Sequence, residues 1–358
     1  MEETRTTPAT SGTTVTFVIP DAERELTAVR LYQEIRRPRN GPGFAYDGSA
    51  GAWTLDFPLP GADRMEYLVE IVHPDGSSGT GLDPHNDLRA PGAFGDKSVV
   101  EMPGYEAPEW LAEPNANEST VSELALRCPA VKGHIPCLLW SPPDTDGAEP
   151  LPLLIVNDGP EFAAYSSLTH LIEVAIATRR LPRFRAALLK PVERDEIYSA
   201  SAAYARSFLS SMMPALLQVA PTPPGRDARV GMGASLGALS MLYTHRRSPA
   251  TFGALYLQSG SYFRARFDKQ ESGFPRFRRV SRFVGEVLST EEWAFPIPVT
   301  MTCGGIEENL TNNRAVWRAL ERQGYDVTLV ENPDGHNWTG WRDTFDPHLV
   351  DLLGRMWT

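Results

Sequence analysis

The amino-acid sequence predicts two domains: a β-rich N-terminal domain, then a larger α/β domain with a mostly parallel, doubly wound sheet. Its 358 residues are long for one domain and sufficient for two. Apolar and polar residues alternate with period two up to about residue 102, whereas short apolar runs alternate with helical stretches after residue 119. A hydrophobic content of 42% is ordinary for a globular protein that buries a core.

The first domain, residues 14–104, is predicted to be a small β-sandwich of immunoglobulin-like type. In Trp53–Leu59 and in Tyr67–Ile71, apolar residues occupy every second position, which is typical of strands that cover a core on one side. Clusters of Gly, Pro, Asn and Asp separate such runs. Residues 1–13, rich in Thr, Ser and Pro, are predicted to be disordered, and residues 105–119 are predicted to be a linker.

The second domain, residues 120–358, alternates apolar runs with helical stretches, which predicts helices on both faces of a parallel sheet. The predicted strands are Leu151–Asn157, Arg185–Lys190, Ala228–Gly233, Phe252–Gln258, Pro298–Cys303 and Asp326–Glu331. The predicted helices are Leu168–Thr178, Ala202–Leu217, Leu236–Arg247, Asn312–Gln323 and Phe345–Arg355.

A Gly-x-Ser-x-Gly motif, Gly233–Gly237, lies between a predicted strand and a predicted helix. In α/β-hydrolases this arrangement is the nucleophile elbow, a strained turn that exposes the serine hydroxyl and lets strand and helix pack closely. The same pentapeptide also occurs by chance as a turn of small residues, but its position between strand and helix favours catalysis. The sequence therefore predicts an α/β-hydrolase domain with Ser235 as the nucleophile.

A base and an acid follow Ser235 in the order that α/β-hydrolases use. A serine hydroxyl needs a base to take its proton, and that base needs an acid to orient it. His336 lies in a glycine-bearing loop after the last predicted strand, and Glu307 lies in the loop after the strand before it. His336 and Glu307 are the predicted base and acid. The alternatives left open are His348 as base and Glu308, Asp334 or Asp343 as acid.

Two backbone N–H groups are predicted to form an oxyanion hole, which acyl transfer needs to stabilise its tetrahedral intermediate. One belongs to Leu236, the residue after the nucleophile. The other is expected in the loop after an earlier strand, where Pro160 has no N–H and Gly159 or Asp158 remains. A simple turn at Asp158–Gly159 is the alternative.

The composition excludes several function classes. A net charge of −11 argues against nucleic acid as a partner, since phosphate binding needs a positive surface. The longest apolar runs are too short to span a bilayer, and the acidic, polar start has no apolar segment typical of a secretory signal. Three cysteines without CxxC spacing indicate neither a disulfide framework nor a zinc site. A cytoplasmic protein that needs no metal or organic cofactor is expected.

Several segments together resemble the enterochelin (enterobactin) esterase family, cytoplasmic siderophore esterases within the α/β-hydrolases. The likeness covers nearly the whole chain. The matching segments are Asp83–Pro84, Lys97–Val99, Ile155–Phe162, Arg194–Ile197, Gly233–Ala238, Gly305–Glu307 with Asn313 and Arg314, and Gly335–Trp338 with Trp341 and Arg342. The family's Gly-Gly-His-Asp stands here as Asp334–Asn337, and the segment at Arg194 is one residue shorter than the family's.

The resemblance implies hydrolysis of the ester bonds of a macrolactone siderophore, ferric or iron-free, so that iron is released inside the cell. It implies Ser235 as nucleophile, His336 as base and Glu307 as acid. Arg194, Asp158 and Trp338 are expected at the substrate site, although Arg194 could equally serve only to hold its loop. The N-terminal domain could cover the active site, or act only in stability or as a dimerisation module, so a homodimer is left open.

A basic, aromatic segment at residues 261–283 fits an anionic aromatic substrate. Seven basic residues and two acidic ones occur there, interleaved with five phenylalanines. Arg276, Arg278 and Arg279 are predicted to bind the substrate. The alternative is a solvated lid whose phenylalanines anchor it to the core. Two other functions also remain open: a carboxylesterase for other acyl or feruloyl-type esters, and a non-catalytic ligand-binding protein on a hydrolase fold.

Overall fold

The computed structural model describes residues 8–114 and 119–358 and divides into two compact units. Unit 1 comprises Met1–Ala107 together with two loop segments, Gly304–Glu308 and Asn332–Gly340. Unit 2 comprises Pro108–Cys303, Asn309–Glu331 and Trp341–Thr358. Both loop segments of unit 1 follow strands of the large sheet along the chain, so residues from the C-terminal half contribute to the unit that also holds the N-terminal strands.

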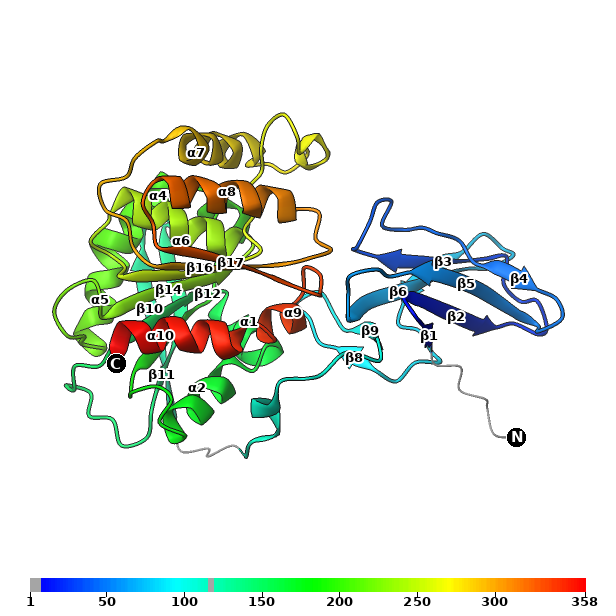
Figure 1. The fold of residues 1–358 in the computed structure, drawn as a ribbon, viewed down its shortest axis with the longest axis horizontal. Helices are drawn as coiled ribbons and strands as arrows, with labels where there is room; N and C mark the ends of the chain where they lie inside the picture. Colours follow the sequence, from blue (N-terminus) through cyan, green and yellow to red (C-terminus); the bar gives the residue numbers. More distant parts are fainter. Residues whose placement is uncertain (1–7, 115–118) are drawn as a thin grey trace. The chain divides into compact units, whose positions relative to one another are not determined.

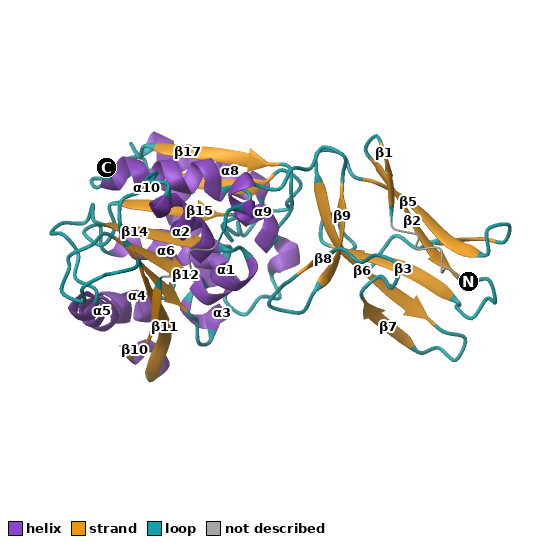
Figure 2. Cartoon of the chain, turned by 90° about the horizontal axis from the view of Figure 1, so that it is seen from below, coloured by secondary structure: helices purple, strands orange, loops and turns teal. Residues whose placement is uncertain are grey.

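Unit 1 contains two antiparallel sheets, and residues 8–107 form strands, turns and loops without a helix (Figure 2). The first sheet has the order β1-β2-β5-β4 and the second β3-β6-β9-β8, with β7 also paired to β6. The strands are β1 (Ala9–Ser11), β2 (Thr14–Pro20), β3 (Ala28–Gln33), β4 (Ala45–Asp47), β5 (Ala52–Pro58), β6 (Arg64–Val72), β7 (Ser78–Gly81), β8 (Arg89–Ala90) and β9 (Lys97–Glu101).

The two sheets of unit 1 share one apolar core. In β2, Val15, Phe17 and Ile19 are buried while the residues between them are half-buried, as the period of two requires. From the second sheet, Leu31 and Tyr67 join the same cluster, and the Tyr67 ring lies edge-on to Phe17 at 4.8 Å. Two sheets that bury their apolar faces against each other form a sandwich, the architecture predicted for this segment.

Unit 2 is built on an eight-stranded mixed sheet with the order β10-β11-β13-β12-β14-β15-β16-β17. From β13 to β16 neighbouring strands are parallel, whereas β10, β11 and β13 pair antiparallel. The strands are β10 (Thr120–Cys128), β11 (Gly133–Ser141), β12 (Leu153–Asn157), β13 (Arg185–Leu189), β14 (Arg229–Ala234), β15 (Ala254–Gln258), β16 (Val299–Gly304) and β17 (Val327–Asn332).

Helices cover both faces of this sheet, with α4, α6, α7 and α8 on one side and α1, α2 and α10 on the other (Figure 1). They are α1 (Gly159–Tyr165), α2 (Leu168–Ala177), α3 (Arg194–Ile197), α4 (Ala202–Ser207), α5 (Met213–Val219), α6 (Leu236–Arg247), α7 (Phe277–Ser289), α8 (Leu310–Arg322), α9 (Trp338–Arg342) and α10 (Val350–Trp357). Short 3-10 turns lie at Glu109–Ala112, Pro129–Val131 and Lys269–Glu271, and π-helical turns at Phe208–Met212 and Phe345–Leu349.

The predicted strands of the α/β part and three of the predicted helices are present, with boundaries within two residues of those predicted. The helix predicted at Ala202–Leu217 is divided into α4, a π-helical turn and α5, and the one predicted at Phe345–Arg355 starts with a π-helical turn before α10. Three other predictions need correction. Ala9–Ser11 pairs with β2 although disorder was predicted there, while residues 1–7 lie outside the described residues. The antiparallel pair β10 and β11 was not predicted. Within the predicted linker, residues 109–112 form a 3-10 turn, and residues 115–118 lie outside the described part.

In the described part of the chain, each helix is too short or too polar to cross a membrane.

Candidate active site

Ser235 stands at the turn between β14 and α6 with φ 55° and ψ −123°, a conformation that non-glycine residues rarely adopt. Its two flanking glycines make the turn possible. A Cβ on Gly233 would lie 2.6 Å from the carbonyl carbon of Gly237, closer than real Cβ contacts come. A Cβ on Gly237 would lie 3.1 Å from Oδ2 of Asp158. The elbow therefore needs glycine at position 233, whereas a Cβ at position 237 would require Asp158 to shift by a few tenths of an ångström.

The serine hydroxyl has a neighbour that the sequence analysis missed. Oγ of Ser235 and Oγ of Ser261 lie 3.0 Å apart, and Ser261 itself is buried. The backbones are joined as well, because the N–H of Ser261 donates to the carbonyl of Ser235 at 3.1 Å. Ser261 follows β15, the strand beside β14, so its position after the neighbouring strand was the available signal.

Glu307 and His336 are brought together by the loops that follow β16 and β17. Nδ1 of His336 lies 2.8 Å from Oε2 of Glu307, so with the proton on Nδ1 the imidazole donates to the carboxylate. The other carboxylate oxygen accepts the backbone N–H of Gly304 at 2.7 Å. The Glu307 side chain is 1% exposed and the His336 side chain 36%. A buried carboxylate thus orients a partly exposed imidazole, an arrangement typical of a general base.

The alternative acids each face an arginine, and the alternative base lies in a helical turn. Glu308 pairs with Arg37 at 3.1 Å, and Asp343 pairs with Arg342 at 2.7 Å. Asp334 lies 3.6 Å from Arg64, and burial raises its pKa to about 6 against the opposing charge of Arg64. His348 lies in the π-helical turn before α10. The geometry therefore favours Glu307 and His336.

Ser235 belongs to unit 2, whereas Glu307 and His336 belong to unit 1. Their union in one catalytic triad is part of the function proposed below.

Asp158 and Arg194 form a bidentate ion pair in unit 2, close to the elbow. Nε and Nη2 of Arg194 donate to the two carboxylate oxygens of Asp158, each at 2.8 Å. Burial alone would lower the pKa of Arg194, but the Asp158 carboxylate outweighs it and the pKa lies above its usual value. Because Asp158 uses two guanidinium N–H groups, the pair supports the loop-holding alternative for Arg194.

The two predicted oxyanion donors each occupy the first position of a helix, Gly159 in α1 and Leu236 in α6. N–H groups in the first turn have no acceptor within their own helix. Gly159 also packs against the backbone, since a Cβ there would lie 2.3 Å from Cα of Leu188. Trp338, expected at the substrate site, begins α9 directly after His336 and Asn337.

Several residues of the basic, aromatic segment at residues 261–283 hold it against the rest of unit 2. Arg276 and Arg279 both pair with Glu196 of α3, and Nε of Arg279 donates to the carbonyl of Ser199 at 2.5 Å. Phe277 and Phe283 are buried on the inner face of α7. Arg278 is exposed. Arg276 is exposed as well but pairs with Glu196. The anchoring alternative therefore describes most of this segment.

Comparison with known proteins supports the predicted relationship. No family model matches the chain. The chain is 25% identical over 316 residues to the iron(III) enterobactin esterase of Escherichia coli O6:H1, covering 83% of this chain and 72% of that protein. The enzyme of the same name from strain K12 is 24% identical over the same shares. The resemblance to the enterobactin esterases is confirmed.

Solved structures of enterobactin esterases share the fold. The enterochelin esterase of Shigella flexneri superposes with a TM-score of 0.75 at 20% identity, over 95% of this chain and 92% of that one. The ferric enterobactin esterase of Salmonella typhimurium gives 0.76 at 19% identity, over 96% and 93%. A ferulic acid esterase gives 0.55 over 67% of this chain. Another Shigella flexneri structure was obtained in the presence of enterobactin, at a TM-score of 0.74, 19% identity and shares of 96% and 92%. These similarities show an α/β fold shared with ester hydrolases.

Proposed function

We propose that this protein is a serine esterase that hydrolyses the ester bonds of a catecholate-type macrolactone siderophore, with iron arriving as part of the substrate. The observation that carries the proposal is the hydrogen bond between Glu307 and His336. Their loops follow strands of the same sheet in which β14 delivers Ser235. Since the carboxyl ends of parallel strands β14 and β16 meet at one edge of that sheet, the three residues suit one triad.

In the proposed mechanism, Oγ of Ser235 attacks the ester carbonyl while His336 takes its proton. Because Nδ1 faces Glu307, Nε2 is the atom that accepts this proton, and the buried carboxylate stabilises the imidazolium. The oxyanion of the tetrahedral intermediate is stabilised by the N–H groups of Leu236 and Gly159. His336 then protonates the leaving alkoxide, and a serine acyl-enzyme remains. Water, activated by the same histidine, hydrolyses the acyl-enzyme and regenerates the Ser235 hydroxyl.

The substrate class rests on the relatives, whose names specify iron(III) enterobactin. Arg278 is an exposed cation of α7 that suits an anionic complex, whereas Arg276 and Arg279 pair with Glu196. Within the same proposal, half-buried Trp338, two residues after His336, contributes an aromatic ring to the substrate site. The ion pair of Arg194 and Asp158 lies beside the elbow, since a Cβ on Gly237 would lie 3.1 Å from Oδ2 of Asp158.

The proposed domain organisation keeps the immunoglobulin-like type for residues 14–104, supported by two antiparallel sheets around a common core. A cytoplasmic location is part of the proposal and rests on the family resemblance. Dimerisation stays an open prediction.

The deciding experiment incubates the purified protein with a ferric and an iron-free catecholate trilactone and separates the products by chromatography. Ring opening is expected with the wild-type protein and is expected to vanish in Ser235→Ala. Turnover of simple or feruloyl esters without ring opening would favour the carboxylesterase alternative, a function that the ferulic acid esterase fold also hosts. No turnover of any ester would favour a non-catalytic binding protein.

A further inference from the structure

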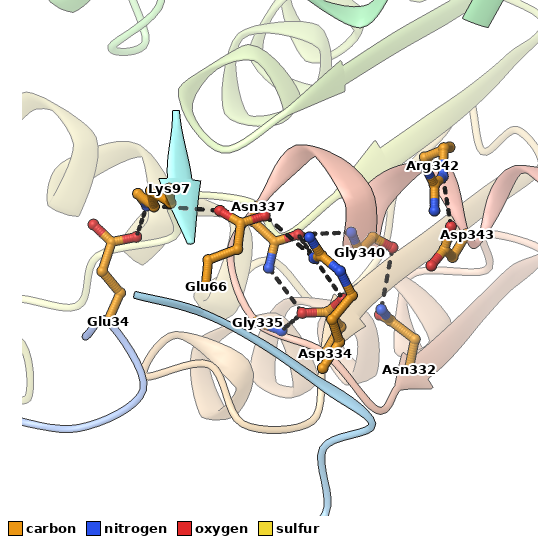
Figure 3. A network of polar contacts seen from close by, with 11 residues as sticks. Glu34, Glu66, Lys97, Asn332, Asp334, Gly335, Asn337, Gly340, Arg342 and Asp343 are labelled. Atoms are coloured by element: carbon orange, nitrogen blue, oxygen red, sulfur yellow. Dashed lines mark hydrogen bonds and ion pairs between the residues drawn. The ribbon is translucent and has the colours of Figure 1, made fainter. Parts of the chain in front are cut away.

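Asp334 and Asn337 lie on either side of Gly335 and His336 and hold the loop that carries His336 (Figure 3). Oδ1 of Asp334 accepts the backbone N–H of Gly335 at 2.6 Å and the amide Nδ2 of Asn337 at 2.8 Å. Oδ1 of Asn337 in turn accepts the N–H of Gly340 at 2.7 Å. These bonds fix the backbone on both sides of His336.

Arg64, the first residue of β6, reaches this loop from the N-terminal strands. Its Nη1 lies 3.6 Å from Oδ2 of Asp334 and 3.4 Å from Oδ1 of Asn337. Its side chain is 4% exposed, so the guanidinium is desolvated and depends on these partners. A backbone bond runs alongside, because the N–H of Asp63 donates to the carbonyl of Pro333 at 2.8 Å.

The carboxylate of Asp334 depends on Arg64 for a neutralising positive charge. Nη1 of Arg64 also lies 3.2 Å from Oε1 of Glu66, whose carboxylate faces Lys97 at 3.8 Å. Lys97 is in closer contact with Glu34, at 2.8 Å (Figure 3). Oδ2 of Asp334 accepts no hydrogen bond from the described residues. Without Arg64, the carboxylates of Glu66 and Asp334 would lose the cation between them, and Asp334 would move or take up a proton.

We propose that Arg64 is a positioning residue for the esterase reaction: through Asp334 and Asn337 it holds the loop so that the imidazole of His336 is correctly oriented. This inference rests on the proposed function. Arg64 belongs to the N-terminal β-strands and is far from Ser235, Glu307 and His336 in the sequence. The proposal therefore gives these strands a role in the reaction. Arg64 touches neither the substrate nor the reacting atoms in this proposal.

The test compares Arg64→Met and Arg64→Lys with the wild type on a small aryl ester, which makes few contacts beyond the reacting carbonyl. The concentration of active sites is titrated with a fluorophosphonate, so that kcat refers to folded, reactive protein. We expect Arg64→Met to lower kcat about 10-fold to 100-fold, because a misplaced catalytic group costs rate rather than affinity. KM should stay within about twofold, and Arg64→Lys should recover part of the lost kcat.

The matched control is Arg30→Met, which removes another arginine of the same sheet, paired with Glu70 at 3.1 Å on the surface. It should leave kcat unchanged. Asp334→Asn should reproduce the loss of kcat, and the double variant Arg64→Met/Asp334→Asn should lose little more than either single one, since both act on one loop. If Arg64→Met is not recovered folded, Asp334→Asn decides on the same criterion.

A purely structural role would show as a lower melting temperature with kcat per titrated site within twofold of the wild type, and that result would overturn the inference. The proposed function is tested separately by Ser235→Ala and His336→Ala. If these keep their activity, the proposed triad fails. If they abolish it while Arg64→Met and Asp334→Asn do not affect kcat, only the positioning role fails.

Discussion

Replacing Glu307 by glutamine tests the assignment of the acid, and its neighbour Glu308 provides a matched control. Glutamine keeps the size of the side chain and can still accept the N–H of Gly304, which bonds Oε1 at 2.7 Å. Its amide nitrogen would then face Nδ1 of His336, 2.8 Å away in the native pair. An amide N–H donates, so Nδ1 would have to accept and the proton would move to Nε2.

That tautomer cannot take the proton of Ser235, because Nε2 already carries one. We expect kcat to fall about 10³-fold to 10⁴-fold, as expected for a triad base in the wrong tautomer. At about 1.36 kcal/mol per factor of ten, this corresponds to about 4–5.5 kcal/mol of lost transition-state stabilisation. Burial strengthens the effect, since Glu307 is 1% exposed and water cannot easily replace its carboxylate.

The assay is steady-state hydrolysis of a small aryl ester by Glu307→Gln and Glu308→Gln, with circular dichroism to verify folding. Glu308 is paired with Arg37, and its side chain is 28% exposed, so its substitution should change kcat less than threefold. If Glu307→Gln stays within threefold of the wild type, or if Glu308→Gln is equally impaired, the reasoning fails.

Three further predictions follow from other parts of the structure. Gly159→Ala should lower the free energy of unfolding by about 3 kcal/mol, measured by urea denaturation, because its Cβ would lie 2.3 Å from Cα of Leu188; a stability equal to wild type would contradict this packing. The pKa of Asp334 is raised by burial to about 6, so this group weakens the folded state as pH rises from about 4 to about 6 and its cost stays constant above that. The difference in unfolding free energy between wild type and Asp334→Asn should therefore change by about 2–3 kcal/mol across this window, and a pH-independent difference would refute it. Arg279→Ala should lower the melting temperature because it breaks the contacts with Glu196 and Ser199, whereas exposed Arg278→Ala should keep stability and raise KM only for an anionic siderophore. Equal KM changes on a neutral ester would count against a substrate role for Arg278.

Most of the α/β part was predictable because buried strands and amphipathic helices leave periodic patterns. The strand at Leu153–Asn157 is buried throughout, as a central parallel strand must be, and reads as a continuous apolar run. The pair β10 and β11 was missed because most of β10 is exposed, so it has no such run. Helix α7 was missed for a different reason. Its buried Phe277, Val280, Val284 and Val287 follow the helical period, which the interleaved arginines obscured.

The order of the proposed triad can be read from the sequence, but the residues that contact its members in the fold cannot. The serine motif, the acid loop and the histidine loop follow one another along the chain, so their order could be read directly. Ser261 and Arg64 belong to the surroundings of the site by folding alone, and neither lies in a motif. Arg64 is 270 residues before Asp334, and such a contact leaves no local pattern in the chain.

By itself, the sequence determined the class of chemistry, because a strained turn of glycines around Ser235 and a histidine in a late loop have local signatures. Only the tertiary structure distinguishes the surroundings of Glu307, Glu308 and Asp334. Adjacent or nearby carboxylates are equivalent in a sequence, and their roles differ through the direction in which each side chain points. Glu307 is turned inward by the N–H of Gly304 and meets His336, while Glu308 meets Arg37 and Asp334 meets Arg64. The same physical reason explains why Arg276 and Arg279 differ from Arg278. The sequence shows which residues are charged, but packing determines which partner neutralises each charge.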